Sequence, residues 1–257
     1  MRIIKISGHQ LDDAGFVEQF AAAVAEIGRA EPVVIINGGG KSISALQQAL
    51  GLAERKIDGL RVTDGESLAI TEMVMSAQVN KLVVRALQKA GLDALGLSGV
   101  DGRLLTAQKK HSPKGDLGFV GEIIGVRVEL LRQLIASGLT PVISPVACDV
   151  AGQHYNVNAD EAATAVAQAI SADQLDFVSN VPGVYADWAS KRIMGELTTA
   201  EANQLIATGT ISGGMIPKVQ SALQALAHVP RVRITNLDGL VGGGTVLIAE
   251  LGMRIAE

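Results

Sequence analysis

The stretch Val33-Val34-Ile35-Ile36-Asn37-Gly38-Gly39-Gly40-Lys41-Ser42 decides the fold of this chain. Residues 32–36 are apolar, and all but Pro32 are β-branched, which predicts a buried strand. Three glycines follow at once, and helical spacing resumes behind them as far as Leu50. A strand that passes through glycines into a helix is typical of an α/β fold with a parallel sheet. The glycine N–H groups and the helix N-terminus predict a site for an anion.

The three glycines are also compatible with a purely structural role. A tight turn that needs glycine torsions accounts for them without any ligand. Gly40-Lys41-Ser42 is similar to the end of a P-loop, but that motif requires glycine at position 35, where this chain has Ile35. The chain also lacks the G-x-G-x-x-G motif of dinucleotide-binding folds.

Outward from this stretch, β-branched runs alternate with amphipathic helices, which predicts βαβ units around a mostly parallel sheet. An interruption is expected at 103–125, where spaced glycines and alternating polarity favour antiparallel ribbons. A lobe boundary is expected near residue 172, although no linker marks it. The expected strands are 2–6, 32–36, 94–97, 141–144, 175–179, 231–235 and 245–249, with a hairpin at 55–62. The expected helices are 16–27, 41–50, 64–90, 128–137, 160–170, 199–207 and one after Gly214.

Composition excludes several classes of function. The chain has 257 residues, 48% of them hydrophobic, a net charge of −4 and no basic run, so nucleic-acid binding is not expected. It has no apolar run of about 20 residues and no signal-peptide pattern at its start, so membrane association is not expected. The single cysteine, Cys148, excludes an internal disulfide and favours the reducing cytoplasm. The four histidines lack ligand spacing, so no metal site is expected in the protein.

Three further segments carry charged or polar residues beside glycines or a helix start. Lys5-Ile6-Ser7-Gly8 ends the first strand, 156–160 (NVNAD) enters an Ala-rich helix, and 211–218 (ISGGMIPK) begins another helix. Each can be structural when taken by itself: an edge lysine, a helix cap by Asn158 or Asp160, or a plain turn. Together they supply the lysines and N–H groups that phosphoryl transfer requires.

In order along the chain, these segments resemble the motifs of the amino acid kinase family. The resemblance is greatest to members that phosphorylate N-acetylglutamate. It covers nearly the whole chain and rests on IIKISG (3–8), INGGG (36–40), GLRVTD (59–64), VNK (79–81), GLSGVDG (96–102), GFVGEI (118–123), PVISPV (141–146), YNVNAD (155–160) and GGMIPKV (213–219).

The resemblance implies a three-layer αβα sandwich with a central, mostly parallel sheet. Residues 1–172 would bind the amino acid and form a homodimer, and residues 173–257 would bind ATP with its Mg²⁺. The implied reaction is phosphorylation of the γ-carboxylate of N-acetyl-L-glutamate to an acyl phosphate, a step of arginine biosynthesis. The substrate side chain is already ionised at neutral pH, so no general base is needed.

The resemblance also implies roles for single residues. Lys5 and Lys218 would be the catalytic lysines, and Asp160 would hold both in position. Arg61 would clamp the α-carboxylate of the substrate. The implied substrate contacts are Gly39, Gly40, Arg61 and Asn156, and the implied nucleotide contacts are Lys5, Ser7, Gly8, Gly39, Ser179, Asn180, Gly183, Gly209, Gly214 and Lys218.

Three positions depart from the usual family pattern. Ser7 stands where a glycine is usual, Asn37 where a histidine is usual, and Asn180 where members acting on acetylglutamate commonly have aspartate. None of these departures removes a charged catalytic group. Ser7 is expected to narrow the phosphate site and to lower the rate.

Two alternative functions remain open on the sequence. A related kinase of lysine biosynthesis phosphorylates an amino-blocked α-aminoadipate, and 96–102 and 179–183 resemble that branch. The other alternative is a non-catalytic sensor of amino acids or nucleotides with the same fold. The first expected strand begins at Arg2, which leaves no room for the extra N-terminal helix of arginine-sensitive hexameric relatives. A dimer that arginine does not inhibit through such a ring is therefore expected.

Overall fold

A mixed sheet of eight strands runs through the computed structural model, which describes residues 1–8, 10–187 and 190–249. In the order of the sheet the strands are β14 (Glu196–Thr198), β16 (Thr245–Ile248), β15 (Arg231–Thr235), β11 (Gln174–Val178), β1 (Arg2–Ile6), β2 (Val33–Asn37), β8 (Thr140–Ser144) and β5 (Ala94–Ser98). The strands from β15 to β5 in this order are parallel to one another, and β16 is antiparallel to β15.

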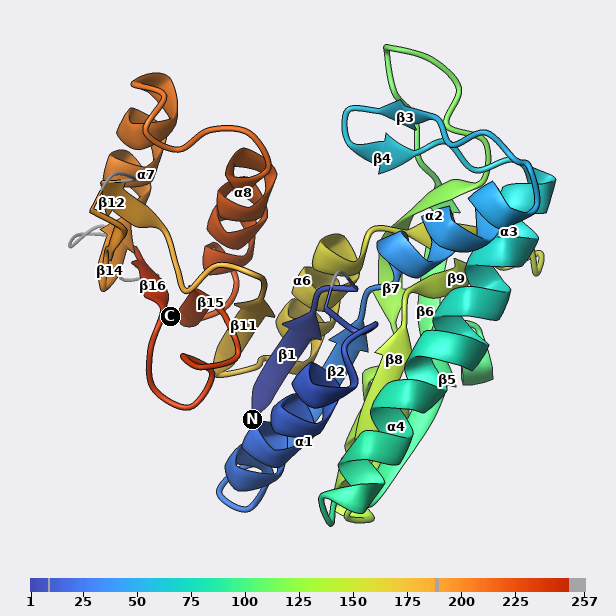
Figure 1. The fold of residues 1–257 in the computed structure, drawn as a ribbon. Helices are drawn as coiled ribbons and strands as arrows, with labels where there is room; N and C mark the ends of the chain where they lie inside the picture. The colour runs from blue at the N-terminus through green and yellow to red at the C-terminus, as the bar shows by residue number, and fades with distance from the viewer. Residues whose placement is uncertain (9, 188–189, 250–257) are drawn as a thin grey trace.

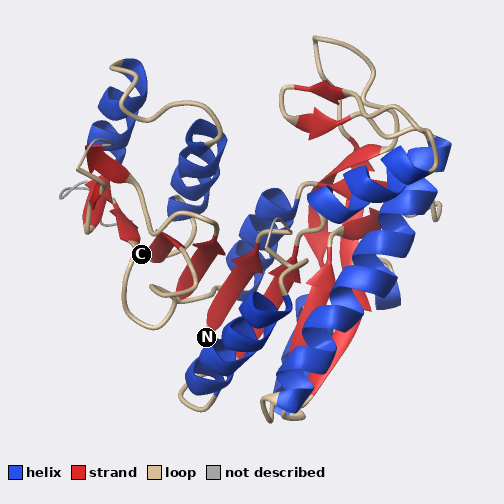
Figure 2. Ribbon diagram, in the orientation of Figure 1, coloured by secondary structure: helices blue, strands red, loops and turns tan. Residues whose placement is uncertain are grey.

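Helices cover both faces of this sheet (Figures 1 and 2). They are α1 (Ala14–Gly28), α2 (Gly40–Ala49), α3 (Gly65–Glu72), α4 (Asn80–Lys89), α5 (Val128–Ala136), α6 (Ala159–Ile170), α7 (Thr199–Ala207) and α8 (Met215–Leu226). The expected three-layer αβα architecture with a mostly parallel sheet is confirmed.

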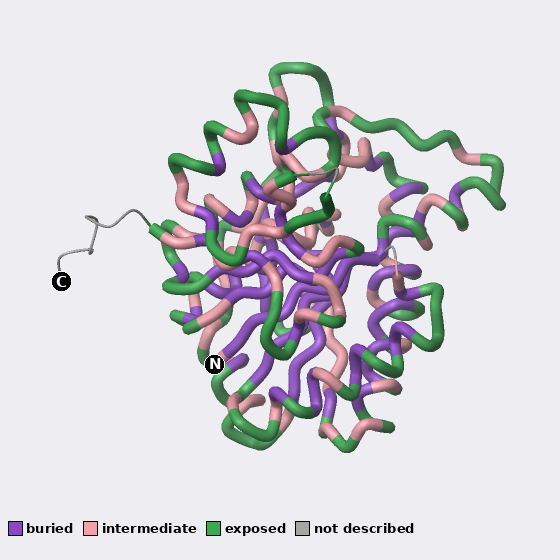
Figure 3. Tube along the Cα trace, turned by 60° about the vertical axis from the view of Figure 1, so that its left-hand side comes forward, coloured by how far each residue is buried: buried purple, intermediate pink, exposed green. Residues whose placement is uncertain are grey.

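Alternation along the central strands divides the core between the two faces. Ile4 belongs to a buried cluster with Phe20 of α1 and Leu87 of α4. Its neighbour Ile3 belongs to a second cluster on the opposite face, with Val166 of α6. Successive side chains of a strand point to opposite faces, so one apolar strand supplies both cores. Figure 3 shows these buried strands enclosed by more exposed helices and loops.

A small closed barrel stands beside the main sheet. Its strands are β6 (Leu105–Lys109), β7 (Val120–Val126), β9 (Val146–Cys148) and β10 (His154–Val157). The antiparallel pairing of β6 with β7 confirms the ribbons expected at 103–125. The barrel itself was not predicted, because its closure depends on contacts with β9 and β10 that lie outside that segment. Cys148, the last residue of β9, is buried in it.

The expected hairpin at 55–62 is present as β3 (Lys56–Ile57) and β4 (Leu60–Arg61). Its turn residues Asp58 and Gly59 both have positive φ, 51° and 79°, as a two-residue hairpin turn requires.

The long helix expected at 64–90 has the correct extent but a different interior. Asp64 caps its start, and Gly91 follows its end with a φ of 91°. Between α3 and α4, however, residues Met73–Val79 form a π-helix. A π-helix has more residues per turn than an α-helix, but in so short a segment the sequence shows no periodicity that distinguishes the two. π-helical turns often occur at functional sites.

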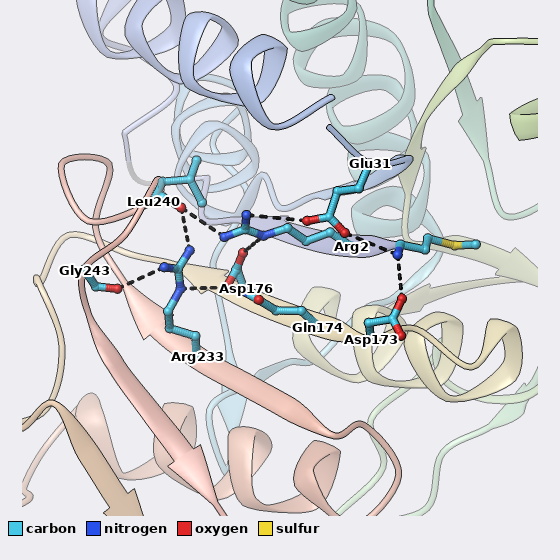
Figure 4. A network of polar contacts seen from close by, with 9 residues as sticks. Arg2, Glu31, Asp173, Gln174, Asp176, Arg233, Leu240 and Gly243 are labelled. Atoms are coloured by element: carbon cyan, nitrogen blue, oxygen red, sulfur yellow. Dashed lines mark hydrogen bonds and ion pairs between the residues drawn. The ribbon is translucent and has the colours of Figure 1, made fainter. Parts of the chain in front are cut away.

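A buried ionic cluster joins strand β1 to β11 and β15. Asp176, which is fully buried, accepts hydrogen bonds from Arg2 Nε and Arg233 Nε, the latter at 2.8 Å. Figure 4 shows the two guanidinium groups on either side of this carboxylate. Both also donate to the carbonyl of Leu240, in the loop between β15 and β16. The two predicted lobes therefore meet through a continuous sheet and a shared charge cluster.

The structure also contains β12 (Tyr185–Asp187) and β13 (Arg192–Ile193), a short antiparallel pair that was not predicted. None of the helices among the described residues is both long and apolar enough to cross a membrane. The boundary at residue 172 stays a prediction.

Candidate active site

Two cavities lie at the carboxyl ends of the central strands, where ligands bind in open α/β sheets. The first, of about 430 Å³, is lined by Lys5, Gly8, Gly39, Arg61, Asn156 and Asp160. The second, of about 680 Å³, is lined by Asn180, Gly209, Gly214 and Lys218. The structure thus places all four expected substrate contacts in the first cavity and four of the expected nucleotide contacts in the second.

Lys5 and Asp160 form an ion pair in the first cavity. Lys5 is buried in β1, and its Nζ atom lies 2.7 Å from Asp160 Oδ1. The contact is an ion pair rather than a well-aligned hydrogen bond, since the enclosed Oδ1 atom finds no hydrogen-bond partner among the described residues. The buried lysine charge is therefore balanced by Asp160, and the alternative of a solvated edge lysine is wrong.

Asp160 is free for this contact because a neighbour caps the helix. Asn158 is the N-cap of α6, and its Oδ1 accepts hydrogen bonds from the N–H groups of Asp160, at 2.7 Å, and Glu161, at 3.4 Å. Of the two capping residues that the sequence allowed, Asn158 is the cap. The Asp160 carboxylate in the first helical turn points its charge to Lys5 instead.

Lys218 lies at the start of α8, behind the N-cap Gly214 and next to Pro217 in the first turn. Burial lowers the pKa of Lys218, the positive charge of Lys5 lowers it further, and Asp160 raises it. These influences place Lys218 within electrostatic range of the Lys5–Asp160 pair. Lys218 has no ion pair within 4.0 Å among the described residues, so its charge is available to an anion between the two cavities.

The two glycine turns pack directly on each other. A Cβ atom at Gly8 would lie 2.7 Å from the backbone of Gly39, and one at Gly39 would lie 2.5 Å from Met75 Sδ. None of Gly8, Gly38, Gly39 and Gly40 has a positive φ. Close approach therefore restricts Gly8 and Gly39 to glycine, whereas Gly40 has open space at its Cβ position, and the alternative of a turn that needs glycine torsions is wrong. Gly39 is the N-cap of α2, and no side chain caps that helix.

Asn37 explains why this turn tolerates a departure from the family pattern. It is fully buried at the end of β2, where its Nδ2 donates to the carbonyl of Met75 at 3.2 Å. Its Oδ1 accepts from Asn80 Nδ2 at 3.0 Å. Asn80 also donates its backbone N–H to the carbonyl of Met75. Asn37 thus links β2 to the π-helix that packs against Gly39.

The predicted substrate residues Arg61, on β4 of the hairpin, and Asn156, on β10 of the barrel, both line the first cavity. The Arg61 guanidinium donates to Ser44 Oγ at 2.8 Å and to the carbonyl of Gly40 at 3.0 Å, and Glu54 lies 3.2 Å away. Burial lowers the pKa of Arg61, and Glu54 opposes this effect. Asn156, on β10, donates from Nδ2 to Thr63 Oγ1 at 3.1 Å.

Two lysines that were not predicted as site residues, Lys56 and Lys41, also line the first cavity. Lys56 lies opposite Arg61 in the hairpin, and its Nζ atom is 2.7 Å from Glu54. Lys41 pairs with Asp12 at 2.9 Å. The hairpin was predicted, so the position of Lys56 across from Arg61 was a usable signal. The cavity consequently offers more positive charge than expected.

Two of the predicted nucleotide contacts, Ser179 and Gly183, line neither of the two cavities. Ser179 is buried, and its Oγ accepts from the N–H of Val181 at 3.3 Å. Gly183 packs against β16, where a Cβ would lie 2.5 Å from Thr245 Oγ1. Gly183 is therefore needed for packing in this structure. Ser7 lines the first cavity with Lys5, Gly8 and Gly39, and their role as nucleotide contacts stays a prediction.

Comparison with known proteins gives a consistent result. Residues 1–236 match the model of the amino acid kinase family. A protein named acetylglutamate kinase from Roseiflexus castenholzii is 50% identical over 96% of this chain and 94% of its own length. Another of that name from Geobacillus stearothermophilus is 46% identical over 98% of each chain. The solved structure of carbamate kinase from Giardia lamblia, at 18% identity, superimposes with a TM-score of 0.70 over 97% of this chain and 98% of its own, and shares the fold.

Proposed function

Because the chain belongs to the amino acid kinase family, we propose that it transfers the γ-phosphoryl group of ATP to the side-chain carboxylate of N-acetyl-L-glutamate. The product is an acyl phosphate, and the step belongs to arginine biosynthesis. The relatives from Roseiflexus and Geobacillus, whose sequences match nearly the whole chain, are named for this activity. This similarity supports the proposal.

The observation that carries this proposal is the grouping of Lys5, Asp160 and Lys218 between two cavities. A carboxylate acceptor and a triphosphate repel each other, so the site must neutralise negative charge as they approach. Lys5 and Lys218 would supply that charge from opposite sides of the transferring group. Asp160 would hold Lys5 in place without neutralising both lysines.

The amino acid would bind in the first cavity and ATP along the second. Arg61 would take the α-carboxylate as a planar donor, which an arginine does with two parallel hydrogen bonds. Asn156 would face the same ligand from β10. Gly8 and Gly39 would donate backbone N–H groups to the phosphate chain, and their packing on Gly39 and Met75, respectively, fixes these two turns in place.

Mg²⁺ would enter with the nucleotide and reduce the charge of its phosphates. The carboxylate nearest to the proposed transfer point, that of Asp160, is already paired with Lys5. This arrangement fits a metal held mainly by phosphate oxygens, with the lysines of the protein supplying the remaining positive charge.

We further propose that the enzyme acts as a homodimer in the cytoplasm. The family resemblance of residues 1–172 motivates the dimer, and the exposed Met73 offers apolar surface on the π-helix of that lobe. The buried, unpaired Cys148 is in keeping with a reducing compartment. Light scattering on the purified protein tests the dimer directly, and a monomeric mass at working concentration would contradict it.

The decisive experiment combines ATP turnover with hydroxylamine, which traps an acyl phosphate as a hydroxamate. N-acetyl-L-glutamate is expected to give hydroxamate in step with ADP, and N-acetyl-α-aminoadipate to give little. Preferred turnover of the longer substrate would favour the kinase of lysine biosynthesis. ADP release without hydroxamate would exclude a carboxylate acceptor, and binding without any turnover would favour a sensor. The sequence similarity to proteins named acetylglutamate kinase does not favour either alternative.

A further inference from the structure

Gln47 is a buried amide next to the first cavity that neither the family resemblance nor the proposed reaction accounts for. It lies on α2 with only 1% of its surface exposed. A buried amide destabilises a fold unless its polar atoms are bonded. Here Oε1 accepts a hydrogen bond from Arg61 Nη1, and Nε2 donates to Ser67 Oγ at 2.9 Å. Ser67 in turn donates its N–H to Asp64, the N-cap of α3, at 2.8 Å.

The three acceptors on α2 that hold Arg61 follow helical spacing. Nη2 donates to the carbonyl of Gly40 and to Ser44 Oγ, and Nη1 donates to Gln47 Oε1. Positions i, i+4 and i+7 share one face of a helix. One face of α2 therefore binds both terminal nitrogens of the Arg61 guanidinium. Gly40 and Ser44 accept from Nη2, and Gln47 accepts from Nη1.

The chemistry of an amide suits this task. Its oxygen accepts a hydrogen bond and so orients the guanidinium plane, yet it leaves the positive charge of Arg61 intact. A carboxylate at the same position would compete with an anionic ligand. Glu54, 3.2 Å from Arg61 Nη2, is also 2.7 Å from Lys56, so its charge is divided between two cations.

We propose that Gln47 is a positioning residue that sets the plane of the Arg61 guanidinium for a substrate carboxylate. This inference rests on the proposed function, because it assigns to Arg61 the α-carboxylate of N-acetylglutamate. It predicts that Gln47 affects the binding of that carboxylate alone. Phosphoryl transfer, ATP binding and binding of the rest of the amino acid are expected to be independent of Gln47.

The test pairs an enzyme variant with a truncated ligand. Gln47→Met keeps the length of the side chain and removes its acceptor, and Gln48→Met is the matched control at the exposed neighbouring position. Calorimetry then compares N-acetyl-L-glutamate with 4-acetamidobutanoate, which lacks only the α-carboxylate. Gln47→Met is expected to weaken binding of N-acetylglutamate roughly ten-fold or more, since a hydrogen bond to a charged group is lost. Binding of 4-acetamidobutanoate and of ATP is expected to stay unchanged, as is kcat.

The possible outcomes separate this inference from the proposed function. Equal weakening of both ligands, or no weakening, would overturn the role of Gln47 while wild-type binding still supported the kinase. A wild-type protein that binds neither ligand would overturn both proposals. If Gln47→Met does not fold, Ser67→Ala takes its place, since it frees the far end of the Gln47 amide without touching Arg61. A several-fold loss confined to N-acetylglutamate is then expected, and a loss shared by both ligands would contradict the inference.

Discussion

Lys5 Nζ and Asp160 Oδ1 lie 2.7 Å apart, although one residue belongs to the first strand of the sheet and the other to the first turn of α6. The pair exists because Asn158, and not Asp160, caps that helix. Two polar residues separated only by Ala159 thus have separate tasks. Asn158 stabilises the helix, and Asp160 compensates a buried lysine at the proposed transfer point.

Substitution of these two residues is expected to separate activity from stability. Asp160→Asn keeps the size of the side chain and is expected to lower kcat strongly, because Lys5 loses its ionic partner. Asn158→Ala is expected to lower the free energy of unfolding by about 1 kcal/mol through the lost cap. Steady-state kinetics and urea denaturation of both variants check this. Near-normal kcat in Asp160→Asn would refute the proposed role of the ion pair.

Lys5→Ala and Lys218→Ala are each expected to lower kcat on the order of 100-fold or more, with much smaller changes in KM. The reason is that both charges act mainly on the charge of the transition state. Lys89→Ala is the control, because Lys89 pairs with Glu18 on the surface. A lysine whose removal leaves kcat intact does not have the role proposed here.

Lys218 is expected to reduce stability in a pH-dependent way. Burial lowers the pKa of Lys218 below its ordinary value of 10.5, and Lys5 adds to this effect. Between the lowered pKa and 10.5 the folded protein binds fewer protons than the unfolded chain, so stability rises with pH there. Below that window the charged lysine destabilises the fold. Lys218→Met is therefore expected to be more stable than wild type at neutral pH, and this advantage is expected to shrink as the pH rises toward 10.5.

Denaturant titrations of wild type and Lys218→Met at several pH values measure this advantage. The kcat/KM of the wild type is also expected to fall at alkaline pH with an apparent pKa below that of an ordinary lysine, because kcat/KM reports groups of the free enzyme. A stability difference that does not change with pH would contradict the prediction.

Asn37 is expected to matter more for stability than its uncharged side chain implies. Asn37→Leu leaves the amide of Asn80 without its bond to Oδ1 and removes a donor from the carbonyl of Met75, and a loss of about 1–3 kcal/mol is expected. Asn37→His retains a donor and an acceptor and is expected to cost less. Asn203→Leu, on an exposed position of α7, is the control. Equal stability of the leucine and histidine variants, measured by thermal unfolding, would contradict this account.

The Arg2–Asp176–Arg233 cluster makes a further prediction about stability. Asp176→Ala leaves two guanidinium groups without their buried anion, and a loss of about 3–5 kcal/mol is expected. Replacement of all three residues by Met, Leu and Met is expected to recover most of this loss, since no uncompensated charge remains. Urea denaturation compares the two variants. A triple variant as unstable as Asp176→Ala would show that the charges themselves are required.

The amino-acid sequence by itself determined the order and type of most elements and the location of the glycine turns. Periodicity and turn residues act over a few neighbours, so segments such as Arg2–Ile6 and Thr199–Ala207 were predicted with the bounds observed. Lys5, Asp160 and Lys218 were also singled out from the sequence, because they stand beside glycines or at helix starts, and Arg61 was implied by the family resemblance. The reason why these turns need glycine could not be predicted from the sequence, because it depends on how closely Gly8 approaches Gly39.

Only the tertiary structure decided which groups meet. The closed barrel, the π-helix behind Gly39, the place of Gly183 under Thr245 and the contact of Gln47 with Arg61 all join segments that are distant or ambiguous in the sequence. Whether a polar side chain such as Asn158 or Asp160 caps a helix or serves a ligand depends on the partner that packing brings within bonding distance. That partner is selected by the burial of whole strands and helices, and no local pattern encodes it.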